Sequence, residues 1–588
     1  MPKTLLGVNL EVCLGADAGM VTDKLFNPKF QGPEDGKTGL AQGWNKSGSY
    51  NLYGVDYRLV EGESMSGTTS QMIHSYGKRN MYGILQLIKP IKGGEDLEVE
   101  LWARAQHRPI KITVGVRPVA ANKGEPAQAD ILVDRTYWKR YTAILKVKED
   151  EEEPLFFCYV GDGIIYIDQI HLRPKGTHLE EGVQKIISDM KIPVMRFPGG
   201  CATTNYYWRY GIGPAHKRPT HPDQVFKAPV YSYEFGTDEY LAMCVANDII
   251  PQITVNISNE TPEDAAEWAK YVRNWFIKKR IKPPFMYWQI GNEHYGFWEH
   301  GNMTGEMYAD VLKEFVPGIK KAYPNSKIIA LGVKTGGGMY GGEEYAWRKR
   351  VVKKAAKYFD LLAIQHYTPG KRIEDKEKQM LSLLKGVKNI TKSLQETIKD
   401  SRMAGKNKTV AITEWNHWMD AGHCDNKDFL EFYDVQHCLY VSAVFHEFVK
   451  LAPKLELANF YNLVNPMGII LNHGRGVIAT SLVEVFKLYR PAFPGRVVSL
   501  KNNSKILTGD LRQMDSLCLK NEQGTWLFLI NRSTKEEATI ELSGFPAVKE
   551  RVCLSGINLE SEMKKSELWI SSSGKVGLPP FTMARVKF

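Results

Sequence analysis

The chain has 588 residues, more than one hydrophobic core usually supports, so two to four domains are expected. Hydrophobic residues make up 43% and charged residues 24%, which excludes a disordered or collagen-like chain. The net charge of +11 is the small difference between 77 Lys and Arg and 66 Asp and Glu, and it predicts no clustered surface for nucleic acid.

The 8 cysteines are scattered, with no CxxC pair and no Cys/His group at zinc-ligand spacing, so neither a disulfide framework nor a metal centre is predicted. No apolar run approaches the ~20 residues that span a bilayer, and the N-terminal MPKTLLGVNL lacks the long apolar core of a signal peptide. We therefore expect a soluble protein with no membrane and no nucleic acid as partner. The compartment is left open between the cytoplasm and secretion with the signal peptide absent from this chain.

In chain order, the first run is TLLGVNLEV, a short apolar segment that is typical of a buried strand and ends near Glu11. From about residue 24 to 174 the segments read as strands, among them DLEVELWARA, IKITVGV and PLFFCYV, separated by Gly, Pro and charged loops. Because apolar residues alternate and helical segments are absent, this region predicts an antiparallel β-sandwich.

At residue 177 the apolar period changes to that of helices. The run THLEEGVQKIISDM predicts a helix that opens with a T-x-x-E capping box at Thr177. Strands and helices then alternate, and the strand-like runs are VMRF, ITVNIS, YWQIG, IIALG, DLLAIQHY, TVAITEW and ELANFYNLVN. With the opening run they make eight, each followed eventually by a helix such as 427–449, which is the count of a (β/α)8 barrel. After Pro491 the helices stop, and runs such as TWLFLINRS predict a second, smaller sandwich.

The predicted fold class is therefore α/β: a (β/α)8 TIM barrel with an inserted N-terminal β-sandwich and a C-terminal β-sandwich. The first sandwich interrupts the barrel between its first strand and the helix that follows. The expected domains are the first barrel strand in residues 1–16, the inserted sandwich in 17–175, the rest of the catalytic barrel in 176–490 and the C-terminal sandwich in 491–588.

Three predicted barrel strands end in a glutamate: Glu11, Glu293 and Glu414. The active site of such a barrel lies at the carboxyl ends of its strands, so polar residues at these ends are candidates for catalysis. Any one glutamate alone is more often a solvent-facing carboxylate or an ion-pair partner. Glu293 and Glu414, however, end the fourth and seventh strands, whose ends can face one another across the barrel mouth.

A pair of carboxylates suits glycoside hydrolysis, in which one delivers a proton to the leaving oxygen and the other places negative charge beneath the anomeric carbon. A separation of ~5 Å gives retention of configuration, and one of ~6.5–9.5 Å gives inversion. Aromatic residues near these strand ends fit sugar faces and plain core packing about equally well. They are Trp288, Tyr295, Trp298, Trp415 and Trp418.

The run GNEHYGFWEHG, residues 291–301, resembles the G-N-E-x-x-G-x-W-x-x-G acid/base motif of family 51 of the glycoside hydrolases, and ITEWN resembles the nucleophile motif of that family. Further similar runs are RFPGGCATTNYYWRYGIGP, FGTDEYL and LANFYNLVN. The resemblance to α-L-arabinofuranosidases spans the whole barrel. The inserted sandwich resembles carbohydrate-binding modules of families 4 and 9, a layout similar to that of plant-type members.

By this resemblance Glu293 is expected to be the general acid/base and Glu414 the nucleophile of a retaining double displacement. The resemblance also implies that Asn292 hydrogen-bonds the 2-hydroxyl of the sugar and that Tyr367 orients the nucleophile. The full set of expected substrate-binding residues is Glu11, Cys201, Asn292, Trp298, Tyr367 and Asn462.

The chain departs from the family pattern at three positions that are expected to contact the sugar. Cys201 stands where many bacterial members have Asn, although plant-type members also carry Cys. Asn462 stands where Gln is usual, and Gln365 where His is expected. A lost polar contact to a sugar hydroxyl costs ~1–3 kcal/mol, enough to shift the sugar preference. His366, displaced by one position, is expected to point into the barrel wall.

We expect an exo-acting, retaining α-L-arabinofuranosidase that removes terminal residues from plant cell-wall arabinoxylan, arabinan or derived oligosaccharides, without a cofactor or metal. One alternative is an endo-β-1,4-glucanase or endo-xylanase of the same family, and a distant one is a non-catalytic carbohydrate-binding protein. A metallohydrolase using His294, His300 and His417 is disfavoured because there is no HExxH motif.

The sequence says less about sugar binding by the inserted sandwich and about the oligomeric state. Trp44, Trp102 and Trp138 are candidate sugar platforms in the inserted sandwich, although strand-borne tryptophans more often pack inside. Because family members are commonly oligomeric, a homo-oligomer is left open.

Overall fold

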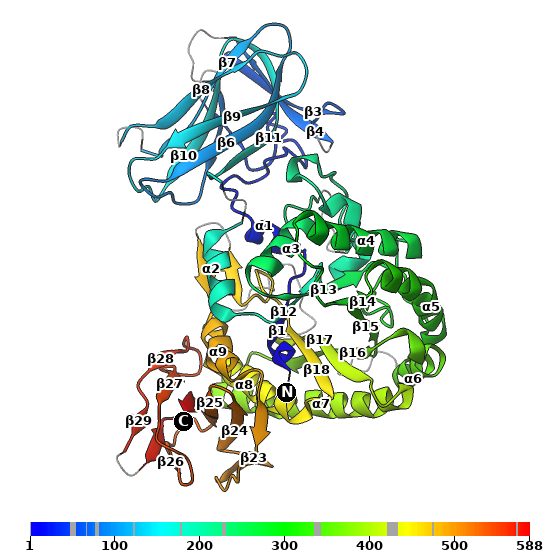
Figure 1. Ribbon diagram of the computed structural model, residues 1–588. Coiled ribbons are helices and arrows are strands. Elements are labelled where there is room, and N and C mark those ends of the chain that lie inside the picture. Colours follow the sequence, from blue (N-terminus) through cyan, green and yellow to red (C-terminus); the bar gives the residue numbers. More distant parts are fainter. Residues whose placement is uncertain are drawn as a thin grey trace.

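The computed structural model describes residues 2–47, 54–65, 68–76, 82–120, 124–176, 179–225, 231–333, 343–419, 433–472, 476–571 and 574–588. In these ranges the chain forms a central barrel, one β-sheet region built from the N-terminal part and another built from the C-terminal part (Figure 1). The barrel begins with the N-terminal residues and resumes only after the first sheet region.

Eight parallel strands close the barrel in chain order. They are β1 (Gly7–Asn9), β12 (Val194–Phe197), β13 (Ile250–Val255), β14 (Met286–Ile290), β15 (Ser326–Leu331), β16 (Leu361–Gly370), β17 (Thr409–Met419) and β18 (Leu455–Phe460). The short strand β1 closes the ring, because Val8 pairs with Met195 on one side and with Phe460 on the other. The predicted fold class, an α/β chain with a (β/α)8 barrel and added sheet regions, is confirmed.

Helices surround the barrel on the outside (Figure 1). They are α2 (Glu181–Met190), α3 (Thr237–Ala246), α4 (Pro262–Lys278), α5 (Gly305–Ala322), α6 (Glu343–Ala355), α7 (Lys376–Ala404), α8 (Val435–Leu451) and α9 (Ser481–Tyr489), with the short α1 (Ala16–Met20) after β1. The helix expected from Thr177 begins at Glu181, and Thr177 lies outside the described residues. Likewise α8 begins at Val435, and residues 427–432 of the expected helix are not among those described.

Two five-stranded antiparallel sheets, β2-β5-β10-β7-β8 and β3-β4-β11-β6-β9, form the inserted region. Their strands are β2 (Asn45–Ser47), β3 (Val55–Glu61), β4 (Thr69–Ser75), β5 (Gly83–Leu87), β6 (Asp96–Ala105), β7 (Ile110–Pro118), β8 (Ala127–Val133), β9 (Lys139–Lys146), β10 (Pro154–Val160) and β11 (Gly163–Pro174). Alternate residues of β6 are buried, as expected for a strand with one face on the core. Side chains of both sheets share one hydrophobic core.

A six-stranded sheet and a three-stranded sheet share a second core at the C-terminal end. Their strands are β21 (Arg496–Val498), β24 (Met514–Asn521), β25 (Gly524–Asn531), β31 (Thr582–Lys587), β27 (Glu550–Ser555) and β28 (Lys564–Ser566), then β26 (Ala538–Glu541), β30 (Lys575–Leu578) and β29 (Trp569–Ile570). Two small hairpins pair β19 (Ile470–Asn472) with β20 (Val477–Ala479), and β22 (Ile506–Thr508) with β23 (Leu511–Arg512). The division of the chain at residues 16, 175 and 490 stays a prediction.

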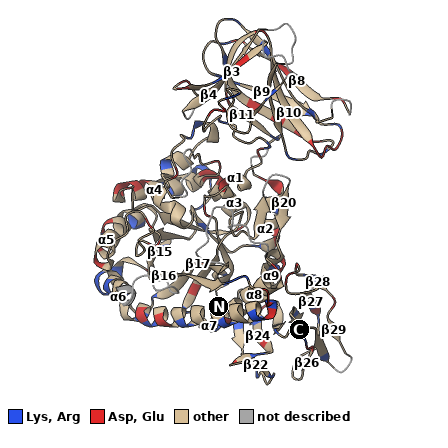
Figure 2. Ribbon diagram, turned by 180° about the vertical axis from the view of Figure 1, so that it is seen from behind, with Lys and Arg blue, Asp and Glu red and all other residues tan. Residues whose placement is uncertain are grey.

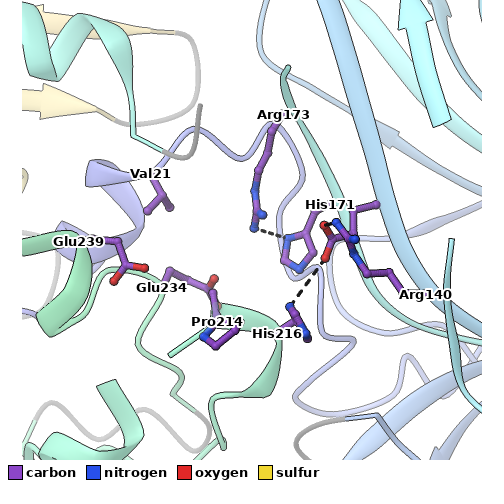
Figure 3. Close-up of a pocket in the computed structure, with 10 residues that line it drawn as sticks. Val21, Arg140, His171, Arg173, Pro214, His216, Glu234 and Glu239 are labelled. Atoms are coloured by element: carbon purple, nitrogen blue, oxygen red, sulfur yellow. Dashed lines mark hydrogen bonds and ion pairs between the residues drawn. The ribbon is translucent and has the colours of Figure 1, made fainter. Parts of the chain in front are cut away.

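A polar cavity of about 240 Å³ lies where the inserted sheets meet loops of the barrel (Figure 3). Its charged side chains are already matched: Arg140 donates to Glu100 at 2.5 Å, and Arg173 lies 3.2 Å from Asp23. Beside it the Trp102 ring packs 5.4 Å from the ring of His216, a barrel-loop residue. The two ion pairs lie within the inserted region, whereas the pair of Lys29 with Glu234, at 3.0 Å, and the packing of Trp102 on His216 join that region to the barrel.

Charges of both signs are spread over the outer helices, including α7 (Figure 2). Within the described ranges, no helix has both the length and the apolar composition needed to cross a membrane.

Candidate active site

The two glutamates expected to be catalytic lie in the loop just after β14 and within β17. At β17 the pairing with β16 shifts, so that Ile364 pairs with Ile412 but Gln365 pairs with Glu414. The extra residue, Thr413, is a β-bulge, a device that re-aims side chains near active sites. It places Glu414 beside Gln365.

After β14 the backbone turns sharply, with φ of +74° at Gly291 and +45° at Glu293. A left-handed conformation is uncommon for a residue with a side chain, and such strain is concentrated at functional sites. The N–H of Gly296 donates to the carbonyl of Glu293 at 2.7 Å, which fixes the turn.

Three donors face the carboxylate of Glu414, which is 5% exposed. Oε1 accepts from Nη1 of Arg196 at 2.5 Å and from Nε2 of Gln365 at 3.0 Å. Oε2 accepts from the Tyr367 hydroxyl at 2.8 Å. This set holds the carboxylate in one orientation and offsets its charge with a guanidinium.

Glu293 lies in the same site and is 4% exposed. Its Oε2 accepts from the indole N–H of Trp298 at 2.6 Å, and its Oε1 lies 3.2 Å from the Tyr295 hydroxyl. That hydroxyl also lies 2.8 Å from Oε1 of Gln365, whose amide nitrogen donates to Glu414. The line from Glu293 through Tyr295 and Gln365 to Glu414 therefore connects the two carboxylates within one site.

The Asn292 side chain is fully buried, and both ends of its amide form hydrogen bonds with protein groups. Oδ1 accepts from Nη2 of Arg196 and from Nε2 of Gln365, both at 2.7 Å. Nδ2 donates to Oε1 of Glu299 at 2.8 Å and lies 3.7 Å from Sγ of Cys201. Asn292 thus joins both catalytic ends of the site, and the sugar contact that the resemblance implies stays a prediction.

Glu11 meets Glu414 at the floor of the site. A Cβ built on Gly200 would lie 2.5 Å from Oε1 of Glu414 and 3.0 Å from Oε1 of Glu11, so both carboxyl groups lie against this glycine. Burial first, and then the charge of Glu414, raise the pKa of Glu11 to about 7. The N–H of Ala202 donates to Oε1 of Glu11 at 2.8 Å.

Asn462 lies behind Glu11. Its Oδ1 accepts from the backbone N–H groups of Glu11 at 3.2 Å and Leu463 at 2.9 Å, and the side chain is fully buried. In this arrangement Asn462 fixes the backbone that presents Glu11.

The hydroxyls of Tyr295 and Tyr367 stay protonated, because burial and the nearby glutamates raise the pKa of each well above its usual range. Gln365 contacts Glu414, whereas Nε2 of the buried His366 lies 3.3 Å from Oγ1 of Thr368.

One group in the described part of the chain has atoms close enough to share a metal ion: Cys201, Glu293 and Glu299, whose ligand atoms lie within 4.8 Å of one another. Burial raises the pKa of Cys201 well above its ordinary value, so the thiol is neutral and a poor ligand. His294, from the metallohydrolase alternative, contacts other groups: Nε2 lies 2.8 Å from Ser258 Oγ, and Nδ1 accepts from Asn292 N–H.

Sequence reasoning singled out the glutamates but missed the buried groups that connect them, above all Arg196 and Glu299. Arg196 is a fully buried charge in the barrel strand β12. In the sequence, the single charged residue in the apolar run VMRF was the signal that could have pointed to it. Glu299 is 2% exposed although it lies in a loop, where a glutamate is usually exposed, so the sequence gives no signal of its burial.

Residues 186–363 match the profile of a family described as the alpha-L-arabinofuranosidase 1 domain. An intracellular exo-α-(1→5)-L-arabinofuranosidase of Acetivibrio thermocellus is 22% identical over 423 residues, covering 65% of this chain and 82% of that protein. An intracellular exo-α-L-arabinofuranosidase of Bacteroides ovatus is 24% identical, covering 52% of this chain. This chain spans 62% of the length of the Bacteroides relative.

Solved structures share the fold. The α-L-arabinofuranosidase of Thermotoga maritima, in complex with arabinose, superposes with a TM-score of 0.59 at 22% identity over 69% of this chain and 89% of that one. An arabinose-bound family 51 α-L-arabinofuranosidase superposes with a TM-score of 0.74 at 13% identity over 100% of this chain and 97% of that one. The matching family profile and the named relatives show that this chain is a glycoside hydrolase similar to α-L-arabinofuranosidases, and the solved structures show that it shares their fold.

Proposed function

We propose that this enzyme removes terminal α-L-arabinofuranosyl residues from arabinoxylan, arabinan or derived oligosaccharides of plant cell walls, with retention of configuration. The observation that carries the proposal is the line Glu293–Tyr295–Gln365–Glu414, which sets two buried carboxylates in one site. The names of the Acetivibrio and Bacteroides relatives, both exo-acting arabinofuranosidases, support the choice of sugar and the exo action.

In the first step Glu414 attacks the anomeric carbon and forms an arabinosyl ester. Its Oε1 and Oε2 are each held by donors, so the attacking carboxylate needs no reorientation. The bond from the anomeric carbon to the leaving oxygen breaks with its electrons on that oxygen, and Glu293 supplies the proton.

In the second step water replaces the leaving group. Glu293, now a carboxylate, takes a proton from the water as the water oxygen attacks the anomeric carbon. The ester bond breaks with its electrons on Glu414, which restores the enzyme. The Trp298 indole N–H, 2.6 Å from Glu293, stays in place to stabilise the carboxylate between the steps.

The test compares Glu414→Gln and Glu293→Gln on two substrates, dinitrophenyl arabinofuranoside with a good leaving group and methyl arabinofuranoside with a poor one. Proton NMR of the wild-type reaction identifies the anomer that is released first. Loss of Glu414 abolishes turnover of both substrates. Loss of Glu293 spares the first step of the dinitrophenyl substrate, because dinitrophenolate leaves without a proton, but slows the second step, in which Glu293 is the base. Glu562→Gln, a 72%-exposed carboxylate in the C-terminal region, is the matched control.

Three results would overturn the proposal: no arabinose released by the wild type, an inverted first product, or long oligosaccharides released from xylan or glucan. The last would make the enzyme an endo-acting member of the family. Full turnover by both glutamine variants would assign the catalysis to other residues, and absence of any glycosidase activity in the wild type would leave the alternative of a carbohydrate-binding protein.

A further inference from the structure

The loop after β14 carries a second buried glutamate that the proposed mechanism does not use. Glu299 is 2% exposed. Its N–H donates to the carbonyl of Gly296 at 3.1 Å, and its carbonyl accepts from the N–H of Asn302 at 3.2 Å. The backbone therefore holds this side chain in place independently of the carboxyl group.

The carboxyl group of Glu299 lies against the acid/base end of the site. One carboxyl oxygen of Glu299, one of Glu293 and Sγ of Cys201 lie within 4.8 Å of one another. Oε1 of Glu299 accepts from Nδ2 of Asn292 at 2.8 Å. Two buried carboxyl groups at this distance do not both ionise easily, and their protons leave as those of a pair.

We propose that Glu299 is a positioning residue that acts through Glu293: it keeps the proton of the acid/base available and holds the Asn292 amide in its orientation. This inference rests on the function proposed above, in which Glu293 is the acid/base. Glu299 itself gives no proton to the substrate.

The groups that face Glu299 come from three parts of the barrel. Glu293 belongs to the same loop, Cys201 to the short helix η2 (Cys201–Asn205) after β12, and Glu11 to the end of β1. Burial first, then the charge of Glu293, raise the pKa of Glu299 to about 8, and the charge of Glu11 adds to this. The cation of Arg196 reaches the opposite end of the Asn292 amide, at Oδ1.

This arrangement affects both steps of the reaction. When Glu293 has passed its proton to the leaving oxygen, it carries a new negative charge, and a neutral Glu299 adds no second charge beside it. Between the two proton losses of the pair one shared proton remains, and while it lies on Glu293 the charge of Glu299 opposes its loss. The acid form of Glu293 therefore persists to higher pH than it would beside a neutral group.

Glu299 also fixes the direction of the Asn292 amide. Because Nδ2 is bound to Glu299, Oδ1 points toward Arg196 and Gln365, and both of these residues donate to Glu414. A reversed amide would set its NH₂ group against two donors.

The test is Glu299→Gln, which keeps the shape and an oxygen for Asn292 but cannot titrate. We would measure kcat/KM against pH with methyl arabinofuranoside, which needs acid catalysis, and with the dinitrophenyl arabinofuranoside, which does not. For the methyl substrate the basic limb of the variant is expected to lie at lower pH by about one unit or more, the coupling at which two groups titrate as a pair. For the dinitrophenyl substrate this limb is expected to coincide with that of the wild type.

The controls separate this role from a structural one. Glu562→Gln is expected to leave both profiles unchanged, and Glu299→Asp, which keeps a carboxyl, to place the limb nearer that of the wild type. If Glu299→Gln lowers kcat/KM by one factor at every pH, or has no effect, the inference is overturned. A wild type inactive on both substrates would instead remove the proposed function.

A second measurement serves if Glu299→Gln does not fold. Carbon-13 NMR of glutamate carboxyls is expected to show a resonance that titrates near pH 8 in the wild type and is shifted or lost in Glu299→Asp. Identical titrations in the two proteins would overturn the inference.

Discussion

Nη1 of Arg196 lies 2.5 Å from Oε1 of Glu414, and both side chains are buried. The same guanidinium donates from Nη2 to Oδ1 of Asn292 at 2.7 Å and from Nε to Oγ1 of Thr254 at 3.0 Å. One planar group thus ties the proposed nucleophile to the residue that precedes the proposed acid/base. A lysine, with a point charge on a flexible stem, cannot satisfy these acceptors together.

We therefore expect Arg196→Lys to lower kcat/KM by roughly 10²- to 10³-fold, the cost of losing one preorganised donor at a charged centre. Arg196→Met is expected to destabilise the fold as well, by about 3–5 kcal/mol, because it leaves a buried carboxylate without its partner. Steady-state kinetics and thermal unfolding measure the two effects. Arg350→Lys is the control, since Arg350 is 46% exposed and pairs with Glu306 on the surface. Wild-type kinetics in Arg196→Lys would contradict this role of the Arg196 guanidinium.

Gly200 allows a close approach that no other residue permits. Its Cβ would meet Oε1 of Glu414 at 2.5 Å, nearer than real Cβ atoms come to other groups, so Gly200→Ala must displace a carboxyl group. We expect kcat/KM to fall by about 10²-fold, as for a misplacement of ~1 Å at a reacting group. Gly36→Ala is the matched control, because its Cβ would meet nothing within 4 Å. Equal kinetics in the two variants would show that Glu414 and Glu11 move aside without consequence.

The barrel could be predicted because each strand is an apolar run followed by a helical period, and two of the strand tips carry the glutamates. The bulge at Thr413 could not, because it depends on the pairing of two strands and leaves no mark in the run TVAITEW. Without that bulge the sequence gives no reason to set Gln365, rather than its neighbour His366, against Glu414.

The hydrogen-bond partners of the Asn292 and Asn462 amides could not be predicted from the sequence either. The contacts of Asn292 and Asn462 with the sugar, which the resemblance implies, stay predictions. The structure adds that the first is bound to Arg196, Gln365 and Glu299, and the second to the backbone beside Glu11. Arg196 and Gln365 belong to β12 and β16, far from Asn292 in the chain, and Glu11 is 451 positions from Asn462. Hydrogen bonding within a closed barrel is a long-range property, which local spacing does not encode.

Glu11 predicts a pH dependence of stability. Its pKa is raised from 4.5 to about 7 in the fold, so the folded chain holds a proton that the unfolded chain has lost. The stability from this group is present below pH 4.5 and is lost as the pH rises through about 7. Over that window the loss is roughly 3 kcal/mol, at about 1.4 kcal/mol for each pKa unit.

Glu11→Gln removes this contribution. The melting temperature of the variant, relative to the wild type, is therefore expected to rise between pH 4.5 and 7. Thermal unfolding at several pH values measures this difference, and Glu562→Gln controls for loss of a carboxylate. A difference that is constant with pH would mean that Glu11 titrates alike in the folded and unfolded chains.

Trp44 of the inserted region has two possible roles, as a platform that binds sugar or as part of the hydrophobic core. The ring is 5% exposed, stacks on Phe30 at 5.2 Å and meets Phe156 edge to face at 6.2 Å. Its indole N–H donates to the carbonyl of Asn27 at 3.0 Å. We expect Trp44→Ala to destabilise the inserted sheets by about 3–5 kcal/mol, the cost of emptying a large core site. Activity on small arabinofuranosides is expected to persist, because this core is separate from that of the barrel.

The control for Trp44→Ala is Tyr137→Ala, since Tyr137 is 61% exposed and its loss empties no core site. Calorimetry and a pull-down with insoluble arabinan separate the two roles of Trp44. A core role lowers the unfolding temperature of Trp44→Ala and leaves the affinity of the folded protein for arabinan unchanged. If Trp44→Ala unfolds at the same temperature as Tyr137→Ala but no longer binds arabinan, Trp44 contacts sugar. That result would contradict the core role.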